Sequence, residues 1–292
     1  MKQGELALAA AVVCAMLVPN PALTGAEPHG GDGGVPVAVE AHFQRGNTLE
    51  TQGDLDGAIA EYRQAERLAP GSAQAHYTLG AALGAKGALD EAVVEDREAI
   101  RLQPDFAEAH LKLGVALYAR GDSNGALAEY RAAVRFGAGL PDAHNSLALA
   151  LKREGDLKGA IAEYREAIRL QPNSPYLHYN LGSSLKAGGD LEGAIAEYRA
   201  ALSDLPEFPQ AHNNLGNALL EKGDLSGAIA EFRLAVKLTP QNAVAHYNLG
   251  AALEKRGDRR EALGEYRLAS QLQPSDPDYR ASVERLFLDL GP

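Results

Sequence analysis

The sequence repeats itself every 34 residues from residue 39 to residue 276, without insertion or deletion. Glycine recurs at one position of the period, at Gly53, Gly87, Gly121, Gly155, Gly189, Gly223 and Gly257. Proline closes six of the seven repeats, at Pro70, Pro104, Pro172, Pro206, Pro240 and Pro274. Self-similarity at such a period is typical of stacked supersecondary units. We therefore divide the chain into repeats 39–72, 73–106, 107–140, 141–174, 175–208, 209–242 and 243–276.

Each repeat encodes a pair of helices, as residues 209–242 show. Apolar and small residues around Leu215 follow the i, i+3, i+4, i+7 spacing of one helix face. Gly223 can adopt the left-handed backbone that ends this helix, and Asp224 can cap the next one. Phe232 lies with alanines on the inner face of the second helix, which Pro240 ends because proline cannot continue a helix interior. The sequence thus predicts an all-α fold.

The eighth position of each repeat carries a small residue: Gly46, Gly80, Gly114, Ala148, Gly182, Gly216 and Gly250. The second helix carries an aromatic residue at Tyr62, Tyr130, Tyr164, Tyr198, Phe232 and Tyr266. With the recurring Ala and Pro, this pattern resembles the tetratricopeptide repeat (TPR) family. The resemblance implies a right-handed α-solenoid of seven TPR helix pairs. Two residues depart from the family pattern, namely Asp96 in place of the aromatic and Arg45 in place of a leucine.

Residues 277–292 follow the last repeat and predict a further helix. Its apolar residues share one face: Tyr279, Val283, Leu286, Phe287 and Leu290. We expect this helix to cap the exposed end of the stack, because terminal repeats need a partner for their apolar face.

The N-terminal residues 1–26 have the features of a signal peptide. The apolar run from Leu6 to Val18 is too short to span a bilayer, follows Lys2 and precedes small residues up to Ala26. The one cysteine, Cys14, lies within that run, so no internal disulfide is possible. Residues 27–38 are a Gly/Pro-rich linker. The sequence therefore predicts an exported protein, periplasmic or secreted, that contacts a membrane only through an uncleaved signal.

The charge and the motifs argue against several function classes. The formal net charge of −11 repels phosphate backbones, so we expect no nucleic-acid partner. No Ser/His/Asp arrangement, phosphate-cradling loop or metal-binding cluster is visible, and we predict no catalytic residues, no metal and no cofactor. Carboxylates such as Glu163 and Glu197 recur in successive repeats, which indicates a solvated outer face rather than acid–base chemistry.

Seven histidines share the fourth position of every repeat: His42, His76, His110, His144, His178, His212 and His246. Successive copies are expected about 10 Å apart, since packed helices lie 8–10 Å from each other. A zinc ion needs nitrogens at about 2 Å, so these imidazoles cannot converge on one ion. We interpret them as core-edge side chains, each hydrogen-bonded to a neighbour.

In TPR proteins the first helices line a concave groove, and the resemblance implies that their second, fifth, sixth, ninth, twelfth and thirteenth positions face it. Those positions carry nearly balanced charge here, with tyrosines and amides that suit an extended peptide. The candidate groove residues are Tyr77, Tyr118, Tyr176, Tyr179, Tyr247, Asn180, Asn213, Asn214, Asn217 and Asn248.

Two TPR subtypes differ at these positions. The carboxylate clamp of chaperone-binding TPR domains requires a lysine at the fifth position, which no repeat has. The Asn ladder of the O-linked N-acetylglucosamine transferases is matched by Asn180, Asn214 and Asn248 in the last three repeats, although no catalytic domain follows them.

The sequence therefore predicts a non-catalytic scaffold that binds an extended peptide or protein segment in its groove. The alternative is a structural spacer, a self-associating component of an envelope assembly.

Overall fold

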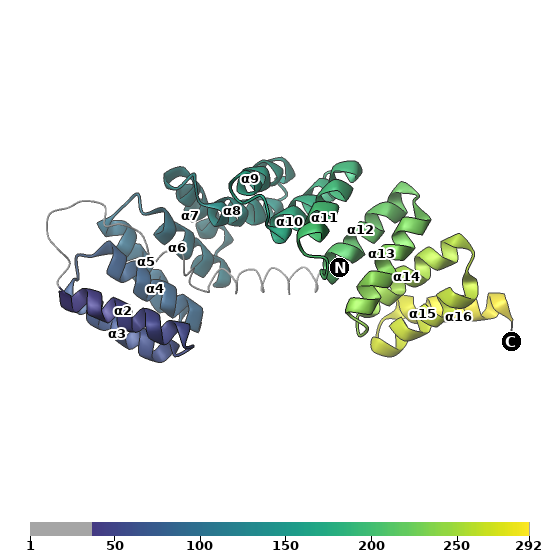
Figure 1. Ribbon diagram of the computed structural model, residues 1–292, viewed down its shortest axis with the longest axis horizontal. Coiled ribbons are helices and arrows are strands. Elements are labelled where there is room, and N and C mark those ends of the chain that lie inside the picture. The colour runs from purple at the N-terminus through teal and green to yellow at the C-terminus, as the bar shows by residue number, and fades with distance from the viewer. Residues whose placement is uncertain (1–36, 292) are drawn as a thin grey trace. The chain divides into compact units, whose positions relative to one another are not determined.

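The computed structural model describes residues 37–291, and in this part of the chain it contains fifteen α-helices and no strand (Figure 1). The all-α prediction is confirmed. The proposed signal peptide, Cys14 and most of the linker lie outside the described residues. Helix α2 (Val37–Thr51) includes residues 37 and 38, the last two residues of the predicted linker.

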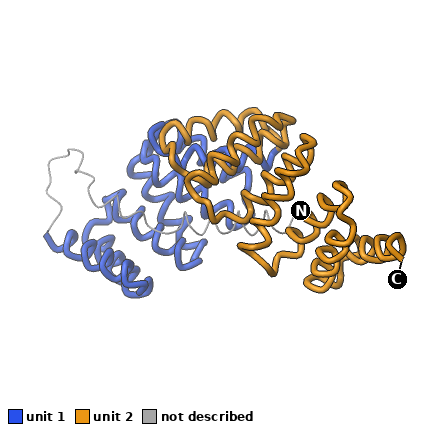
Figure 2. Tube along the Cα trace, turned by 45° about the vertical axis from the view of Figure 1, so that its right-hand side comes forward, with its two compact units in different colours: residues 1–154 blue, residues 155–292 orange. Residues whose placement is uncertain are grey.

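The chain forms two compact units, residues 1–154 and 155–292 (Figure 2). The described helices of unit 1 are α2, α3 (Leu55–Leu68), α4 (Ala73–Lys86), α5 (Leu89–Leu102), α6 (Ala107–Ala119), α7 (Ser123–Phe136) and α8 (Pro141–Glu154). Those of unit 2 are α9 (Leu157–Leu170), α10 (Pro175–Ala187), α11 (Leu191–Asp204), α12 (Pro209–Lys222), α13 (Leu225–Leu238), α14 (Ala243–Arg256), α15 (Arg259–Leu272) and α16 (Pro277–Leu290).

Consecutive helices pack against each other inside each unit. In unit 1, α4 packs against α5 of the same repeat, and α5 packs against α6 of the next. Unit 2 repeats this order, with α12 against α13 and α13 against α14. Even-numbered helices from α2 to α14 are the first helices of the repeats, and odd-numbered helices are the second.

The turn inside a repeat has the predicted geometry. Gly223 ends α12 with a left-handed φ of 92°, where a side chain would be strained. Asp224 then caps α13, its carboxylate accepting the backbone N–H of Gly227 at 2.9 Å. Such a cap stabilises a helix by about 1 kcal/mol, because it satisfies one of the N–H groups left free at the helix start.

The core of each repeat alternates small and large residues. The ring of Phe232 is fully buried and lies directly over Gly216, where an added Cβ would be only 2.7 Å from Cε1. Ala228 and Ala235 on the same helix are also buried. Burying an aromatic ring stabilises the fold by about 1.5–3 kcal/mol, so these contacts hold the two helices of a repeat together.

The second repeat replaces the aromatic residue with Asp96, which is 1% exposed. Its Oδ1 atom has no hydrogen-bond partner and faces Gly80. Burial raises the pKa of the Asp96 carboxyl well above its ordinary value, against the opposing effect of the nearby Lys112. Burying a carboxyl group with an unsatisfied oxygen costs free energy, so we expect Asp96 to lower the stability of its repeat.

Helix α16 packs against α15 and covers the last repeat. Tyr279 and Leu286 are buried, and the Tyr279 ring lies 4.8 Å from that of Tyr247. The prediction for Phe287 is wrong: its side chain is 46% exposed and lies beneath the guanidinium of Arg267, 5.6 Å from the ring centre. The buried residues of α16 are Tyr279, Ser282 and Leu286, at i, i+3 and i+7, and residue 287 lies about 100° around the helix from Leu286.

Within residues 37–291, no helix combines the length and the apolarity that crossing a bilayer requires.

Candidate functional site

The candidate site lies on the first helices of each unit. We define the first-helix face as the side chains at positions 2, 5, 6, 9, 12 and 13 of the repeats. Neighbouring first helices contact one another directly, α4 with α6 in unit 1, and α10 with α12 and α12 with α14 in unit 2. Side chains of consecutive repeats therefore meet on this face.

The asparagines of the sixth position connect consecutive repeats in unit 2. The Nδ2 of Asn214 donates to the hydroxyl of Tyr179 at 3.0 Å. The Nδ2 of Asn248 donates to Oδ1 of Asn213 at 2.9 Å. In both pairs the sixth position of one repeat binds the fifth position of the repeat before it. These amides thus stabilise the packing of neighbouring first helices, a role that the sequence did not reveal.

The side-chain oxygens of Asn214 and Asn248 remain available to accept a hydrogen bond. In the described part of the chain, the Oδ1 atoms of Asn214 and Asn248 accept no hydrogen bond, and both side chains are half-buried. Asn217 is half-buried as well. Asn180 differs, because only 8% of it is exposed. Asn180 is therefore the least accessible of the three ladder asparagines.

Aromatic rings gather on the first-helix face of unit 2. Tyr179 is buried, with its ring centre 5.0 Å from that of Phe208 and 6.0 Å from that of Tyr198. Tyr176 is 50% exposed and meets Phe208 edge to face at 5.4 Å. Tyr247 is half-buried between Tyr266 and the capping helix. Tyr176 is thus the accessible ring of the group, and the others support the helix packing.

Two further candidate tyrosines lie in unit 1, both half-buried. Tyr77 packs against Phe106, with ring centres 4.9 Å apart. The Tyr118 hydroxyl accepts a hydrogen bond from Nη1 of Arg153 at 2.7 Å, and the same guanidinium lies 5.2 Å from the ring centre. Tyr118 is therefore already paired with a cation of the next repeat.

Unit 1 also contains a charged group on this face that sequence reasoning missed. Lys112 occupies the sixth position of its repeat, and burial lowers its pKa, although Asp96, Asp142 and Glu50 oppose that shift. Burial also raises the pKa of Glu50, whose carboxylate accepts from the Tyr62 hydroxyl at 3.0 Å. The departure at Asp96 was the available signal, because a buried carboxylate favours a cation nearby.

The histidines are core-edge side chains, as predicted, and each is hydrogen-bonded to a neighbour. His212 binds Glu231 through Nδ1 at 2.6 Å and the carbonyl oxygen of Pro206 through Nε2 at 2.8 Å. The interpretation of Glu197 as a solvated carboxylate is wrong, because it binds His178 at 2.6 Å. Glu163, at the same position of the preceding repeat, also interacts with another group of the protein.

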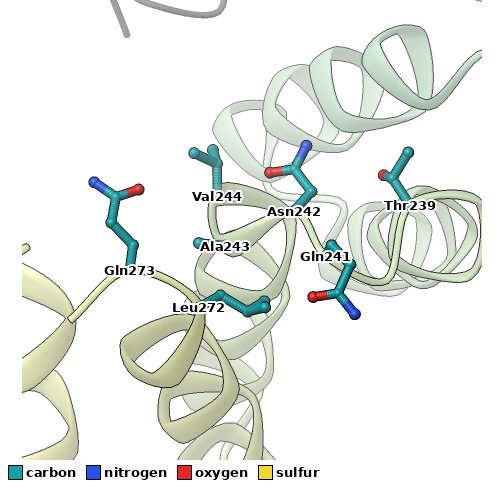
Figure 3. A pocket seen from close by; sticks show the side chains of 7 residues that line it. All are labelled: Thr239, Gln241, Asn242, Ala243, Val244, Leu272 and Gln273. Atoms are coloured by element: carbon teal, nitrogen blue, oxygen red, sulfur yellow. The ribbon is translucent and has the colours of Figure 1, made fainter.

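No set of three or more metal-ligating side chains comes together among residues 37–291. Side chains instead surround an open depression of about 500 Å³ between the start of α14 and the end of α15 (Figure 3). Amide groups of Gln241, Asn242 and Gln273 line it, beside the apolar Val244 and Leu272. The carboxamide oxygen of Asn242 is already hydrogen-bonded, because it caps α14 by accepting from the backbone N–H of Ala245 at 3.2 Å.

Sequence models of known families match most of the chain. A TPR repeat model matches residues 46–87, 83–121 and 150–187. Two tetratricopeptide repeat models match residues 179–243 and 219–286. The chain belongs to the tetratricopeptide repeat family. Membership of this family indicates a protein-interaction scaffold and is typical of proteins without catalytic activity.

Solved TPR structures share the fold. The Pseudomonas aeruginosa PilF structure has a TM-score of 0.64 at 20% identity and covers 73% of this chain and 97% of its own. YrrB, described as a TPR protein with an unusual peptide-binding site, has a TM-score of 0.57 at 20% identity over 63% of this chain and 95% of YrrB. MamA has a TM-score of 0.53 at 25% identity over 56% of this chain and 95% of MamA. No curated protein sequence matches the chain significantly.

Proposed function

We propose that this TPR protein is a non-catalytic scaffold that binds an extended peptide or protein segment on the first-helix face of unit 2. One observation carries the proposal: consecutive repeats there present the unpaired Oδ1 atoms of Asn214 and Asn248, and the same face carries the exposed ring of Tyr176. Amide oxygens accept backbone N–H groups of any sequence, and an exposed aromatic ring covers apolar side chains.

The repeat spacing fits an extended chain. Packed helices lie about 8–10 Å apart, whereas an extended peptide advances about 3.3 Å per residue. Every third residue of a bound segment would thus meet a new first helix. Each amide hydrogen bond contributes a net ~0.5–1.5 kcal/mol, so several repeats together give a useful affinity from individually weak contacts.

The relatives add support of a general kind. The peptide-binding site named for YrrB shows that a protein of this fold uses its surface to hold a peptide. The near-neutral charge of the first-helix positions also favours a segment of mixed composition over a highly charged one.

Selection of binding peptides from a displayed random library, followed by calorimetry, tests the proposal. Tyr176→Ala and Asn217→Ala should each weaken the selected peptide about 3- to 30-fold, because each removes one contact without breaking an inter-repeat hydrogen bond. Asn124→Ala is the matched control, an exposed amide on second helix α7, and should leave the affinity unchanged.

The outcome also addresses the spacer alternative. If all three variants bind the selected peptide as tightly as the wild type does, the first-helix face is not the binding site. Absence of any selected peptide, together with concentration-dependent growth in mass by light scattering, would favour a self-associating spacer instead.

We further propose that the protein is exported to the periplasm or secreted. The support is the apolar run from Leu6 to Val18 with the small residues before Ala26. N-terminal sequencing of the protein recovered from the cell envelope and medium checks this. A chain that keeps Met1 and stays with the cytoplasmic fraction would contradict it.

A further inference from the structure

The same three groups meet at successive repeats: a histidine of the first helix, a glutamate of the second helix and a backbone carbonyl of the preceding repeat. We call this arrangement the histidine clamp. In unit 1, His76 lies 2.6 Å from Glu95 Oε2 and 3.1 Å from the Pro70 oxygen, and His110 has the corresponding distances of 2.7 and 2.9 Å.

Unit 2 contains three more complete clamps with the same geometry. The Nδ1 atoms of His178, His212 and His246 each lie 2.6 Å from a glutamate oxygen. Their Nε2 atoms lie 2.9, 2.8 and 3.0 Å from the carbonyl oxygens of Pro172, Pro206 and Pro240. The recurrence in both units shows that the arrangement belongs to the repeat rather than to one site.

The chemistry of the clamp requires a proton beyond those of a neutral pair. Both ring nitrogens face acceptors, a carboxylate and a carbonyl, and neither acceptor can donate when the glutamate is ionised. A neutral imidazole carries one N–H and can satisfy only one of them. The imidazolium donates to both acceptors. A neutral imidazole beside a protonated glutamate holds the same number of protons and also satisfies both hydrogen bonds.

The two hydrogen bonds have different structural roles. The bond to glutamate joins the two helices of one repeat, whereas the bond to the carbonyl joins that repeat to the one before it. A neutral imidazole keeps its hydrogen on the nitrogen facing the charged carboxylate, the stronger acceptor. The Nε2 lone pair then faces the carbonyl lone pairs, so the contact between repeats is the one lost.

We propose that the histidine clamps make the packing of successive repeats proton-dependent, so that repeats within each unit hold together most firmly at mildly acidic pH and separate more readily above neutral pH.

The surrounding charges support protonation. Glu95 and Glu98 of α5 and Glu66 of α3 act on His76. Arg97 and Arg101 of α5 line a surface pocket together with His76. His110 faces Glu129 and stacks at 5.5 Å on the Phe136 ring, on which Arg135 also lies. Glu231 is the charged group acting on His212. A carboxylate is therefore in direct contact in every case.

The pKa shifts have the expected direction. Burial opposes the charge of His76 and His212, but the hydrogen bonds to glutamate and to the carbonyl outweigh it and raise both pKa values above 6.5. The bond to Glu129 raises the pKa of His110. A raised folded pKa means that the stabilisation is complete below pH 6.5 and is lost as the pH rises through the folded value.

The first repeat supplies a natural control. The Nδ1 of His42 lies 2.7 Å from Glu61, but the partner of its Nε2 among the described residues is Nη2 of Arg45, at 3.4 Å, in place of a carbonyl oxygen. His42 therefore lacks the hydrogen bond that joins neighbouring repeats in the histidine clamps.

Nuclear magnetic resonance of the histidine rings in the full chain tests the proton requirement. We expect His110 and His212 to titrate above pH 6.5, and Glu129→Gln to return the pKa of His110 toward its ordinary range without changing that of His212. Titration of both histidines at or below pH 6.5 in the wild type would overturn the proposal, whatever the variants do.

Amide hydrogen exchange tests the structural consequence. After correction for base catalysis, the opening equilibrium at the α5–α6 junction should rise by up to about tenfold per pH unit between pH 6.5 and the folded pKa of His110, where opening releases one proton, and should level off above that pKa. His110→Gln should abolish this extra pH dependence, because glutamine does not titrate, whereas His42→Gln should preserve it. The same pH dependence in His110→Gln as in the wild type would contradict the proposal.

Discussion

At the scale of single residues, the distance between the two helices of a repeat depends on the absence of one methyl group. The Cα of Gly216 lies against the ring of Phe232, and Gly182 and Gly250 have the same relation to Tyr198 and Tyr266. Glycine costs a helix interior about 0.5–1 kcal/mol relative to alanine, yet it recurs here because the ring occupies the space of the Cβ.

Gly216→Ala should destabilise the protein by about 1–3 kcal/mol, because the added Cβ would meet the buried Phe232 ring at 2.7 Å. Gly264→Ala is the matched control in helix α15, where an added Cβ meets nothing within 4 Å, and it should stabilise by about 0.5–1 kcal/mol. Urea denaturation measures the change in the free energy of unfolding for both variants. A loss of stability in both variants would show that the helix backbone, not the ring contact, requires glycine.

Asp96→Asn should stabilise the protein at pH 7 by about 1 kcal/mol or more, because it removes a buried charge. A carboxyl whose folded pKa is raised stabilises the fold below its unfolded pKa and loses that contribution as the pH rises through the folded value. The gain from the substitution should therefore shrink as the pH falls toward 4. The exposed Asp105→Asn is the control, with less than ~0.5 kcal/mol expected at either pH. A gain that does not vary with pH would point to a cause other than charge.

At the scale of the element, α16 occupies the register of the first helix of an eighth repeat, since Pro277 follows Ala243 by one period. Its eighth position is Glu284 instead of a small residue. A further second helix could not approach this side chain as α13 approaches Gly216. The guanidinium of Arg285 also binds both carboxylate oxygens of Glu254 on α14. Helix α16 thus ends the stack and binds the last repeat.

Leu286→Ala should lower the stability of the last repeat by about 2–5 kcal/mol, because this side chain of α16 is fully buried. Leu288→Ala removes the same atoms from a side chain that is 79% exposed, and a change below ~0.5 kcal/mol is expected. Thermal denaturation followed by circular dichroism compares them. Similar melting temperatures for the two variants would mean that α16 does not act as a cap.

At the scale of the whole molecule, the packing of the described helices within each unit joins elements that are near neighbours in the sequence. Within unit 1, α3, α5 and α7 each pack against the helices before and after them, as do α11, α13 and α15 within unit 2. Stability in such a chain is close to a sum of repeat terms and neighbour interfaces. A local defect should therefore remain local.

Gly216→Ala accordingly should reduce amide protection in α12 and α13 first, then in the adjacent α11 and α14. Protection in α2 to α5 should stay at its wild-type value, because a defect in a repeat protein is expected to spread to neighbouring repeats only, and these helices belong to repeats distant in the sequence. Hydrogen exchange read by mass spectrometry resolves this. A uniform loss over all helices would indicate one cooperative unit in place of a sum of repeats.

The amino-acid sequence by itself determined the helix pairs and the register of the fold. Gly223 and Asp224 predicted a turn and a cap that are both present, because their backbone and capping preferences act within a few residues. The position of His212 at the edge of the core also followed from periodicity, which fixes the face of a helix on which a residue lies.

Only the tertiary structure decided which polar groups pair. Asn248 and Asn213 are separated by 35 residues and meet because neighbouring first helices lie side by side. Glu197 was interpreted as solvated, yet it binds His178, because the reach of a side chain across two helices cannot be obtained from periodicity. The exposure of Phe287 and the burial of Asn180 have the same origin. Periodicity places a residue on a face, and the packing of the neighbouring helix decides whether that face is covered and by which atoms.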